Sequence, residues 1–341
     1  MDKDALQKTV KEIVSGDKGI WATDATEGTM NKRMQAVGIS PTPELRKNFR
    51  EVLIQTEGLS QYIGGVILND EIIKQKTSSG VPFCDFVIQK GMTPGIKVDR
   101  RTHDMANFPG EKVADGLDGL RDRMTEYKEM GARFTKFRVT IAIGEGLPSQ
   151  TCVDSNSEVL ARYAALAQEQ SLVPIVEPEV LMAGTHDIEA SEKANLQVLS
   201  TLFDYLKRHR VYLEGVVLKT AWVHPGLDLE SKPDSKDIAE ATIRVLKGSV
   251  PINVGGVVFL SGGDSPEDAT DHLDKLAEIS DLPWRVGFSF ERALEGAAMK
   301  VWGGKEENAQ KAREILLQRA KLNSLAKTGT YEKEMEGDKK E

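Results

Sequence analysis

The chain of 341 residues is 40% hydrophobic and 29% charged, an ordinary composition for a folded globular protein. Its formal net charge of −8 argues against the broad basic face that nucleic-acid-binding proteins need, so no nucleic-acid partner is expected. No apolar run approaches the roughly eighteen residues of a transmembrane helix, and the N-terminus, MDKDALQKTV, is too acidic for a signal peptide. We therefore expect no membrane partner and a cytoplasmic location.

Cysteine and histidine give no sign of a metal site. Cys84 and Cys152 lie in no metal-binding or redox spacing and are expected to be reduced thiols. The histidines are scattered, without an H-x-x-x-H or H-x-H pair, so neither a histidine-rich metal site nor any other metal is expected. They are His103, His186, His209, His224 and His272.

Strand-like and helical segments alternate along the chain. The strand-like runs, in chain order, are residues 19–23, 62–68, 93–98, 132–141, 172–176, 213–218, 255–260 and 284–288. Helical patterns separate nearly all of them: residues 1–18, the segment around Lys32 and Arg33, residues 43–57, 116–130, 157–170, 188–208, 234–248 and 266–280, the segment after Ser289 to about Val301, and residues 305–325. Asn156 or Ser157 is the expected N-cap of the helix over 157–170.

This alternation predicts an α/β protein with a single (βα)8 TIM barrel and extra helices at both ends. No Gly-x-Gly-x-x-Gly motif follows the first strand, which argues against a dinucleotide-binding sheet. We place one barrel domain over residues 1–331. Residues 332–341 are charged and nearly free of apolar side chains, so we expect a mobile tail there.

The run over residues 213–218 is apolar and β-branched, which is typical of a strand buried on both faces, and Lys219 follows it directly. A lysine at this place either reaches solvent along its stem or stays in a dry pocket as a neutral, nucleophilic amine. The solvated lysine is the more common outcome, so Lys219 alone leaves both readings open.

Ionisable residues end most of the other predicted strands as well. In a TIM barrel these C-terminal ends form one mouth, where the active site lies. A solvated charge explains any single position, but so many charges around one mouth indicate a site for an anionic, polyhydroxylated substrate. In chain order the residues are Asp24, Asp70, Lys97, Lys136 with Arg138, Glu177 with Glu179, Lys219, and Arg292 after Ser289.

The mouth divides into two anion sites. Ser261, Gly262, Ser289 and Arg292 follow the seventh and eighth strands, the recurring phosphate position of these barrels, although Ser-Gly-Gly alone equally fits an ordinary capped turn. On the other side a second phosphate would meet Lys97, Arg138, and Lys32 or Arg33. Two anion sites suggest a bisphosphate.

Between the anion sites lie the groups for chemistry. Lys136 near Lys219 would disfavour a second positive charge and so favour the neutral Lys219 amine. Glu177 and Asp24 supply carboxylates for proton transfer.

Several motifs match one family closely: YIGGVIL (62–68), GIKVD (95–99), GLDGL (116–120), KFR (136–138), VLARYA (159–164), VPIVEPE (173–179), YLEGVVLK (212–219), FLSGG (259–263) and AMKVWGGKEEN (298–308). On these motifs the chain resembles class I fructose-bisphosphate aldolase, the Schiff-base, metal-independent kind, over about residues 1–331. The order and separation of VPIVEPE and YLEGVVLK are highly specific, whereas SGG alone is a weak signal. The resemblance implies a homotetrameric barrel of glycolysis and gluconeogenesis, without a cofactor, that cleaves fructose 1,6-bisphosphate to dihydroxyacetone phosphate and glyceraldehyde 3-phosphate.

The resemblance also implies residue roles. Lys219 would form the Schiff base, Glu177 would be the acid/base of its formation, and Asp24 would take the proton of the hydroxyl beside the breaking bond. Lys136 would tune Lys219, and Glu179 would be a supporting carboxylate. The phosphate of the ketone half matches Ser261, Gly262, Ser289 and Arg292, and the aldehyde half matches Lys97, Arg138, Thr29 and Arg33.

The chain departs from the family's pattern in four places. Ala25 stands where the family usually has Glu, Thr220-Ala221-Trp222 replaces Pro-Asn-Met, and Phe290-Glu291 replaces Tyr-Gly. The family's C-terminal tyrosine is missing, and Tyr331 is not its equivalent. Glu291 would repel a phosphate unless it is turned away. These departures keep two alternatives open: an aldolase for another phosphorylated ketose, such as fructose 1-phosphate or sedoheptulose 1,7-bisphosphate, and a divergent scaffold or binding protein.

Overall fold

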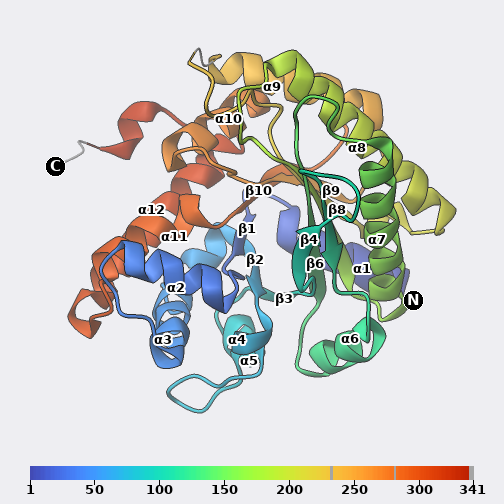
Figure 1. Ribbon diagram of the computed structural model, residues 1–341. Helices are drawn as coiled ribbons and strands as arrows, with labels where there is room; N and C mark the ends of the chain where they lie inside the picture. The colour runs from blue at the N-terminus through green and yellow to red at the C-terminus, as the bar shows by residue number, and fades with distance from the viewer. Residues whose placement is uncertain (231–232, 280–281, 338–341) are drawn as a thin grey trace.

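Parallel strands form a closed barrel at the centre of the molecule, with helices around it (Figure 1). The computed structural model describes residues 1–230, 233–279 and 282–337, and within them the barrel has eight strands. In their order around the barrel these are β1 (Gly19–Ala22), β10 (Val286–Phe290), β9 (Gly256–Phe259), β8 (Val217–Thr220), β7 (Val173–Val180), β6 (Phe134–Ile141), β3 (Thr93–Lys97) and β2 (Ile63–Leu68). The predicted single (βα)8 barrel is confirmed.

The α-helices cover the outside of the barrel, except α1, which lies across one end of it (Figure 1). They are α1 (Lys3–Val14), α2 (Glu27–Ala36), α3 (Pro43–Ile54), α4 (Asp70–Ile73), α5 (Phe83–Gln89), α6 (Leu120–Glu129), α7 (Gln150–Glu169), α8 (Ile188–Arg208), α9 (Ser235–Ser249), α10 (Pro266–Glu278), α11 (Arg292–Trp302) and α12 (Ala309–Ala326). Short 3-10 helices are η1 (Leu59–Gln61), η2 (Leu213–Gly215), η3 (Glu306–Asn308) and η4 (Lys333–Glu336). Among the described residues, no helix combines the length and the apolar character needed to cross a bilayer.

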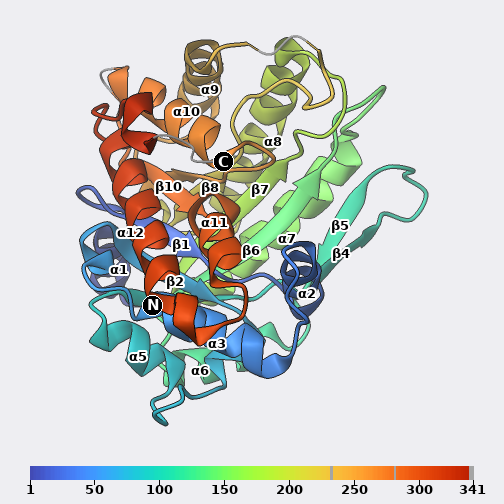
Figure 2. The same ribbon diagram turned by 90° about the vertical axis from the view of Figure 1, so that its left-hand side faces the viewer.

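An antiparallel hairpin forms a separate two-stranded sheet beside β6 of the barrel (Figure 2). Its strands are β4 (Arg101–Asp104) and β5 (Lys112–Asp115). Sequence analysis missed the hairpin because its strands, RTHD and KVAD, are mostly polar and half exposed, so they lack the apolar alternation that marks a strand.

β7 is longer than predicted, because it continues through Pro178 instead of ending at Val176. Val173 and Leu181 donate their backbone N–H groups to β6, and N–H direction alternates along a strand, so residue 178 faces β8. β7 pairs with β8 only at Ile175 and Val176, so the missing N–H of Pro178 interrupts no pairing.

Other predicted boundaries also differ from the structure, and packing explains two of the differences. The run over residues 213–218 is a strand only from Val217, because its first part forms η2 beneath α1. A Cβ on Gly215 would lie 3.1 Å from the Cβ of Leu6, so the close approach of α1 favours glycine there. The helix predicted over 157–170 begins seven residues earlier with Ser149 as its N-cap, and Asn156 lies inside it, donating to the Lys112 carbonyl.

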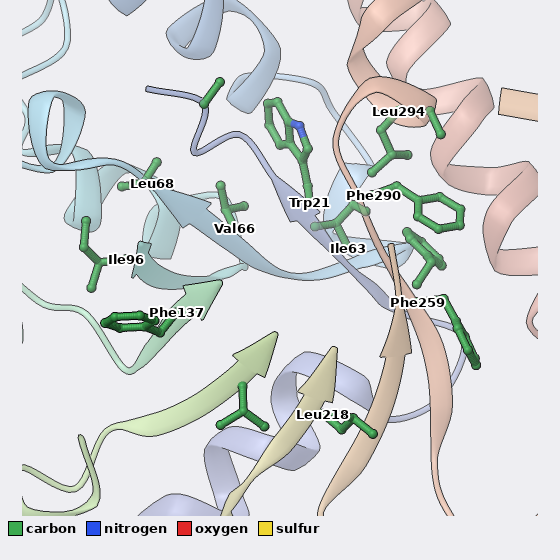
Figure 3. Close-up of a cluster of buried hydrophobic side chains, with 14 of the residues drawn as sticks. Trp21, Ile63, Val66, Leu68, Ile96, Phe137, Leu218, Phe259, Phe290 and Leu294 are labelled. Carbon is green, nitrogen blue, oxygen red and sulfur yellow. The ribbon is translucent and has the colours of Figure 1, made fainter. Parts of the chain in front are cut away.

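Three apolar clusters lie among the described residues, and the two larger ones form most of the barrel core. Of these two, the larger one fills the space between the strands and the surrounding helices, and Figure 3 shows Trp21, Phe259 and Leu294 within it. The smaller one combines inward-facing strand residues such as Phe134 with Leu6 and its neighbours on α1. Because α1 packs against β1, β2, β3, β7 and β9, it closes the N-terminal end of the barrel. The opposite end, at the C-termini of the strands, is not covered by α1.

The C-terminal segment is attached to the barrel by polar contacts. Arg319 of α12 forms an ion pair with Glu336 at 2.5 Å, and the buried Tyr331 donates its hydroxyl to the same carboxylate at 2.9 Å. The expected mobile tail covered residues 332–341, of which 338–341 lie outside the described residues. Its first part forms η4 on these contacts. The sequence did not indicate the contacts of Glu336, because they are an ion pair and a hydrogen bond and not apolar contacts.

Lys327, just after α12, links the two ends of the chain. Its Nζ donates to the carbonyls of Val14 and Lys18, each at 2.8 Å, which lie at the end of α1 and just before β1. Burial lowers the pKa of the Lys327 amine to about 8.

Candidate active site

All the residues to which the family resemblance gives a catalytic or substrate-binding role line one pocket, at the C-terminal ends of the barrel strands. The catalytic candidates in it are Asp24, Lys136, Glu177, Glu179 and Lys219, and the phosphate candidates are Thr29, Arg33, Lys97, Arg138, Ser261, Gly262, Ser289 and Arg292. Asp70 does not line it: it begins α4, where its carboxylate accepts a hydrogen bond from the Tyr127 hydroxyl at 2.6 Å. Lys32, the alternative to Arg33, is also not among the lining residues.

At the floor of the pocket, two lysines and two carboxylates form a continuous chain of ion pairs. Lys136 Nζ lies 2.7 Å from Asp24 Oδ2 and 3.2 Å from Glu177 Oε2. The other oxygen of Glu177, Oε1, lies 3.1 Å from Lys219 Nζ. All four side chains are buried, so Glu177 contacts both amines in a setting that largely excludes water.

Local structure explains why these four groups meet. Lys136 and Arg138, two residues apart on β6, both face the pocket, as their spacing on a strand predicted. β6 and β7 run in parallel register with Arg138 opposite Glu177, so the charged end of each strand lies at the same height. Lys219 comes from β8, the next strand around the barrel.

Electrostatics keep both carboxyl groups ionised. Burial opposes the charge of Glu177, but the attraction of Lys136, Lys219 and Arg138 outweighs it and holds the pKa of Glu177 below its ordinary value. Burial also opposes the charge of Asp24, and Lys136, Lys219 and Lys97 lower its pKa in the same way. The pKa of Lys136 is raised, because Asp24 and Glu177 overcome the effect of its burial. The cluster therefore holds two carboxylates and the Lys136 ammonium at neutral pH.

Two residues that sequence analysis missed hold Asp24 in place. Arg50 of α3 is fully buried, and it donates from Nε to the Thr23 carbonyl at 2.9 Å and from Nη2 to the Ala25 carbonyl at 3.3 Å. Asn69 donates to the same Ala25 carbonyl at 2.8 Å. The backbone on both sides of Asp24 is thus fixed. The signal for Arg50 was its position on the apolar face of a helix, three residues before the buried Leu53.

The ketone-side phosphate candidates surround the N-terminus of α11, where Arg292 is the first residue. Ser289 is buried, and its hydroxyl has no hydrogen-bond partner among the described residues. Arg292 donates to the carbonyl of Gly262, which joins α11 to the loop after β9. Gly262 has φ of +54°, and a Cβ there would lie 2.4 Å from the sulfur of Met182, so the position favours glycine. A helix N-terminus, an arginine and an unpaired hydroxyl suit a phosphate.

On the aldehyde side each predicted cation already has a carboxylate partner. Lys97 Nζ lies 2.5 Å from Asp99 Oδ1, and Arg138 pairs with Glu179. Thr29, by contrast, sits in the first turn of α2 beside the N-cap Thr26, whose hydroxyl lies 3.1 Å from its own. The sequence did not reveal these pairs, because they depend on side-chain conformations and, for Arg138 and Glu179, on the pairing of β6 with β7.

Glu291 is not turned away from the pocket. Its Oε1 lies 2.5 Å from Arg33 Nη1, and Arg33 Nη2 donates to its Oε2 at 3.0 Å. Although burial opposes the charge of Arg33, the hydrogen bond and attraction of Glu291 raise the pKa of this guanidinium. Arg33, a predicted phosphate ligand, is thus held in a two-point ion pair by Glu291, which is one of the departures from the family's pattern.

The other departures lie in different surroundings. Ala25 lines the pocket, whereas Ala221, Trp222 and Phe290 are buried and do not line it. Tyr331, the last tyrosine of the chain, is not among the lining residues either. Of the residues that depart from the family's pattern, Ala25 and Glu291 are therefore placed to contact the substrate directly. Trp222 and Phe290 would affect substrate binding only through their packing against other residues.

Comparisons with known proteins agree with this geometry. A family model described as glycolytic fructose-bisphosphate aldolase class-I matches residues 5–341. A protein of Xanthomonas axonopodis pv. citri named probable fructose-bisphosphate aldolase class 1 is 46% identical over 332 residues, which cover 97% of this chain and 99% of that protein. The Arabidopsis thaliana protein named fructose-bisphosphate aldolase 4, cytosolic, is 45% identical over 315 residues, 92% of this chain and 80% of its own length.

Among solved structures, fructose-bisphosphate aldolase from Plasmodium falciparum, in complex with TRAP and a small-molecule inhibitor, is similar with a TM-score of 0.95. It is 40% identical in sequence, and the match covers 96% of this chain and 95% of that one.

Proposed function

Because this chain belongs to the class-I fructose-bisphosphate aldolase family, we propose that Lys219 forms a Schiff base with the ketone of its substrate. The chain is a lyase that reversibly cleaves fructose 1,6-bisphosphate to dihydroxyacetone phosphate and glyceraldehyde 3-phosphate, in glycolysis and gluconeogenesis. One observation carries the Schiff-base proposal: buried Glu177 contacts both Lys136 and Lys219. A scaffold protein would have no use for two lysines around one buried carboxylate, since buried charges are costly to maintain.

In the first step Glu177 moves protons between Lys219 and the substrate. It starts as a carboxylate and lies within proton-transfer distance of Nζ, so it can accept a proton from the ammonium form. The neutral amine then attacks the C2 carbonyl, and the carbinolamine loses its hydroxyl as water with the proton that Glu177 returns. The product is a protonated imine, in which nitrogen carries the positive charge.

In the second step Asp24 takes the proton from the C4 hydroxyl. The electrons of the C3–C4 bond move into the imine, which becomes a neutral enamine, and the aldehyde product leaves. Lys136 supports this step by keeping Asp24 ionised, because its ammonium lies 2.7 Å from the carboxylate that must act as a base. Glu179 has a supporting role through its pairing with Arg138. The electron sink is thus the protonated imine formed on Lys219, and we propose no cofactor and no catalytic metal.

The two phosphates would lie on opposite sides of this cluster. Ser261, Gly262, Ser289 and Arg292 would bind the phosphate of the ketone half at the N-terminus of α11. The phosphate of the aldehyde half would be bound by Lys97, Arg138, Thr29 and Arg33. To bind it, the three cations among them must weaken or rearrange their ion pairs with Asp99, Glu179 and Glu291. The names of the family and of its relatives favour fructose bisphosphate over the other phosphorylated ketoses.

Assembly and location are further parts of the proposal. A homotetramer rests on the family resemblance, and light scattering of the purified protein would measure it. A cytoplasmic location is supported by the Arabidopsis relative, whose name calls it cytosolic.

Borohydride trapping tests the Schiff base directly. The protein is mixed with dihydroxyacetone phosphate, reduced with borohydride and digested for peptide mapping. We expect a stable adduct on Lys219, because the imine carbon is reduced while it is bonded to that nitrogen. A protein without an adduct, or with the adduct on another lysine, would contradict the assignment.

The Arg33–Glu291 pair makes a prediction about substrate affinity. Glu291→Gln keeps the side-chain shape but removes a negative charge from the phosphate region, so the KM for fructose 1,6-bisphosphate is expected to fall roughly fivefold, equivalent to about 1 kcal/mol for a partly exposed charge. Steady-state kinetics would measure it, with the exposed Glu306→Gln as the charge-matched control. A KM that rises instead would mean that Glu291 is needed to orient Arg33.

A further inference from the structure

The fold brings together three side chains that are far apart in the sequence and that the aldolase reaction does not use. His224 follows β8, Asp264 lies in the loop after β9, and His272 is on α10. One ligand atom from each residue, a ring nitrogen or a carboxylate oxygen, lies within 4.8 Å of the other two. Both histidines are 4% exposed. The scattered histidines gave no metal-binding pattern, because this cluster forms only when the loops after two neighbouring strands meet.

The distances in the cluster are those of ligands around an ion. His224 Nε2 lies 3.7 Å from Asp264 Oδ1, and His272 Nε2 lies 3.7 Å from Asp264 Oδ2. These separations exceed the roughly 2.7–3.2 Å of a hydrogen bond. Ligands bonded to a tetrahedral zinc ion at about 2.0–2.1 Å stand about 3.4 Å apart, so a small inward movement would complete such a site.

The orientation of His224 is that of a metal ligand. Its Nδ1 lies 2.6 Å from the Pro225 carbonyl, and because a carbonyl only accepts, Nδ1 carries the proton. In the neutral ring Nε2 then presents a lone pair, and it faces the carboxylate of Asp264. Histidine ligands of metals typically donate their second ring N–H to a backbone carbonyl in this way.

His272 supplies an independent observation. Neither of its ring nitrogens has a hydrogen-bond partner among the described residues, although the side chain is buried. Trp222, stacked on Phe259, meets the His272 ring edge-on and forms an apolar wall beside it.

We propose that His224, Asp264 and His272 bind one divalent first-row transition-metal ion, with zinc as the reference ion. Two imidazoles and one carboxylate suit this class of ion, and a water molecule would complete the coordination. The site lies outside the ion-pair chain of Lys136, Glu177 and Lys219, so it takes no part in bond cleavage.

The ion would act on the loops that border the active site. Asp264 comes two residues after Gly262, and His224 comes five residues after Lys219. A metal bonded to both would tie the Ser261–Gly262 loop to the segment after Lys219 and to α10. Its expected effects are on stability and, if the proposed function of the loop in phosphate binding holds, on KM.

Metal stoichiometry and spectroscopy test the site on the full-length protein. After treatment with a chelator and desalting, the protein is loaded with zinc or cobalt(II), desalted again and analysed for metal. We expect one equivalent of zinc to be retained, cobalt(II) to show the visible absorption of a tetrahedral site, and zinc at a hundred times its Kd to raise the Tm by about 4 °C. Wild-type protein that retains no zinc would overturn the proposal.

Variants distinguish this site from adventitious binding. His272→Ala and the nearly isosteric Asp264→Asn are expected to lose the bound equivalent. His209→Ala should keep it, because His209 pairs with Glu158 on the surface. Retention by either cluster variant, or loss by the control, would contradict the assignment, and the cobalt(II) spectrum of the wild type decides the matter if both cluster variants fail to fold.

This test is separate from the test of the aldolase mechanism. Metal content is read without substrate, whereas borohydride trapping of Lys219 is expected to succeed in the metal-depleted protein.

Discussion

Lys219→Met is expected to lower the rate of fructose 1,6-bisphosphate cleavage by roughly 10⁴-fold or more. Methionine has a similar length and fits an apolar strand, but it has no amine, so neither the imine nor the enamine can form. A coupled assay of aldehyde release would measure the loss. Borohydride reduction of the variant with dihydroxyacetone phosphate should give no adduct.

Two controls accompany this variant. Its circular dichroism should match the wild type, because Glu177 keeps its ion pair with Lys136 when Lys219 is removed. Lys305→Met removes an exposed lysine of the loop before η3 and should retain full activity. Cleavage within tenfold of the wild type in Lys219→Met would show that the nucleophile is another residue.

Lys136→Met is expected to reduce both activity and stability. Lys136 is the ion-pair partner of Asp24 and of Glu177, so its removal leaves two buried carboxylates with Lys219 as their nearest amine. They would hold Lys219 in the protonated, non-nucleophilic form, and kcat should fall by roughly 10²–10⁴-fold. Removing one member of a buried ion pair costs about 3–5 kcal/mol in the free energy of unfolding.

The pH dependence identifies the cause of the stability loss. The pKa values of Asp24 and Glu177 are lowered in the folded protein, so the stability they contribute with Lys136 is present above their unfolded values of about 4 and disappears as pH falls through the folded values. The pKa of Lys136 is raised, so its contribution is complete below about pH 10 and is lost only as pH rises through the folded value. Urea unfolding should therefore show the full difference between wild type and variant near pH 7 and a smaller one below pH 4. A pH-independent difference would point to lost packing instead.

The sequence could predict which charged side chains line the active site, because the C-terminal ends of all strands in a parallel barrel lie at one mouth. Once residues 132–141 and 172–176 are recognised as neighbouring strands, Lys136, Arg138 and Glu177 must meet at one mouth. The alternation of strand side chains, with the C-terminal position of each charge, determines this without any knowledge of distances.

Which charged side chains form ion pairs with one another at this mouth could not be predicted in the same way. That Glu177 lies between Lys136 and Lys219, or that Glu291 reaches Arg33, depends on the twist of the barrel and on side-chain conformations. Arg50 illustrates the limit: its place on an apolar helix face was visible, but not that its guanidinium would bind the backbone beside Asp24. The contacts of Glu336 with Arg319 and Tyr331 could not be predicted for the same reason, because apolar periodicity does not indicate which polar side chains pair.

The contacts of Lys327 have a consequence for biosynthesis. β1 is the first strand to leave the ribosome, yet it pairs with β10, with Ile20 opposite Ser289, and the turn between α1 and β1 receives its hydrogen bonds from Lys327. Most of the polypeptide is therefore translated before the first strand gains its second neighbour. Until then the nascent sheet has an open edge at β1, available for pairing with other chains. The barrel can close only once β10 has been translated, and Lys327 then attaches the turn between α1 and β1.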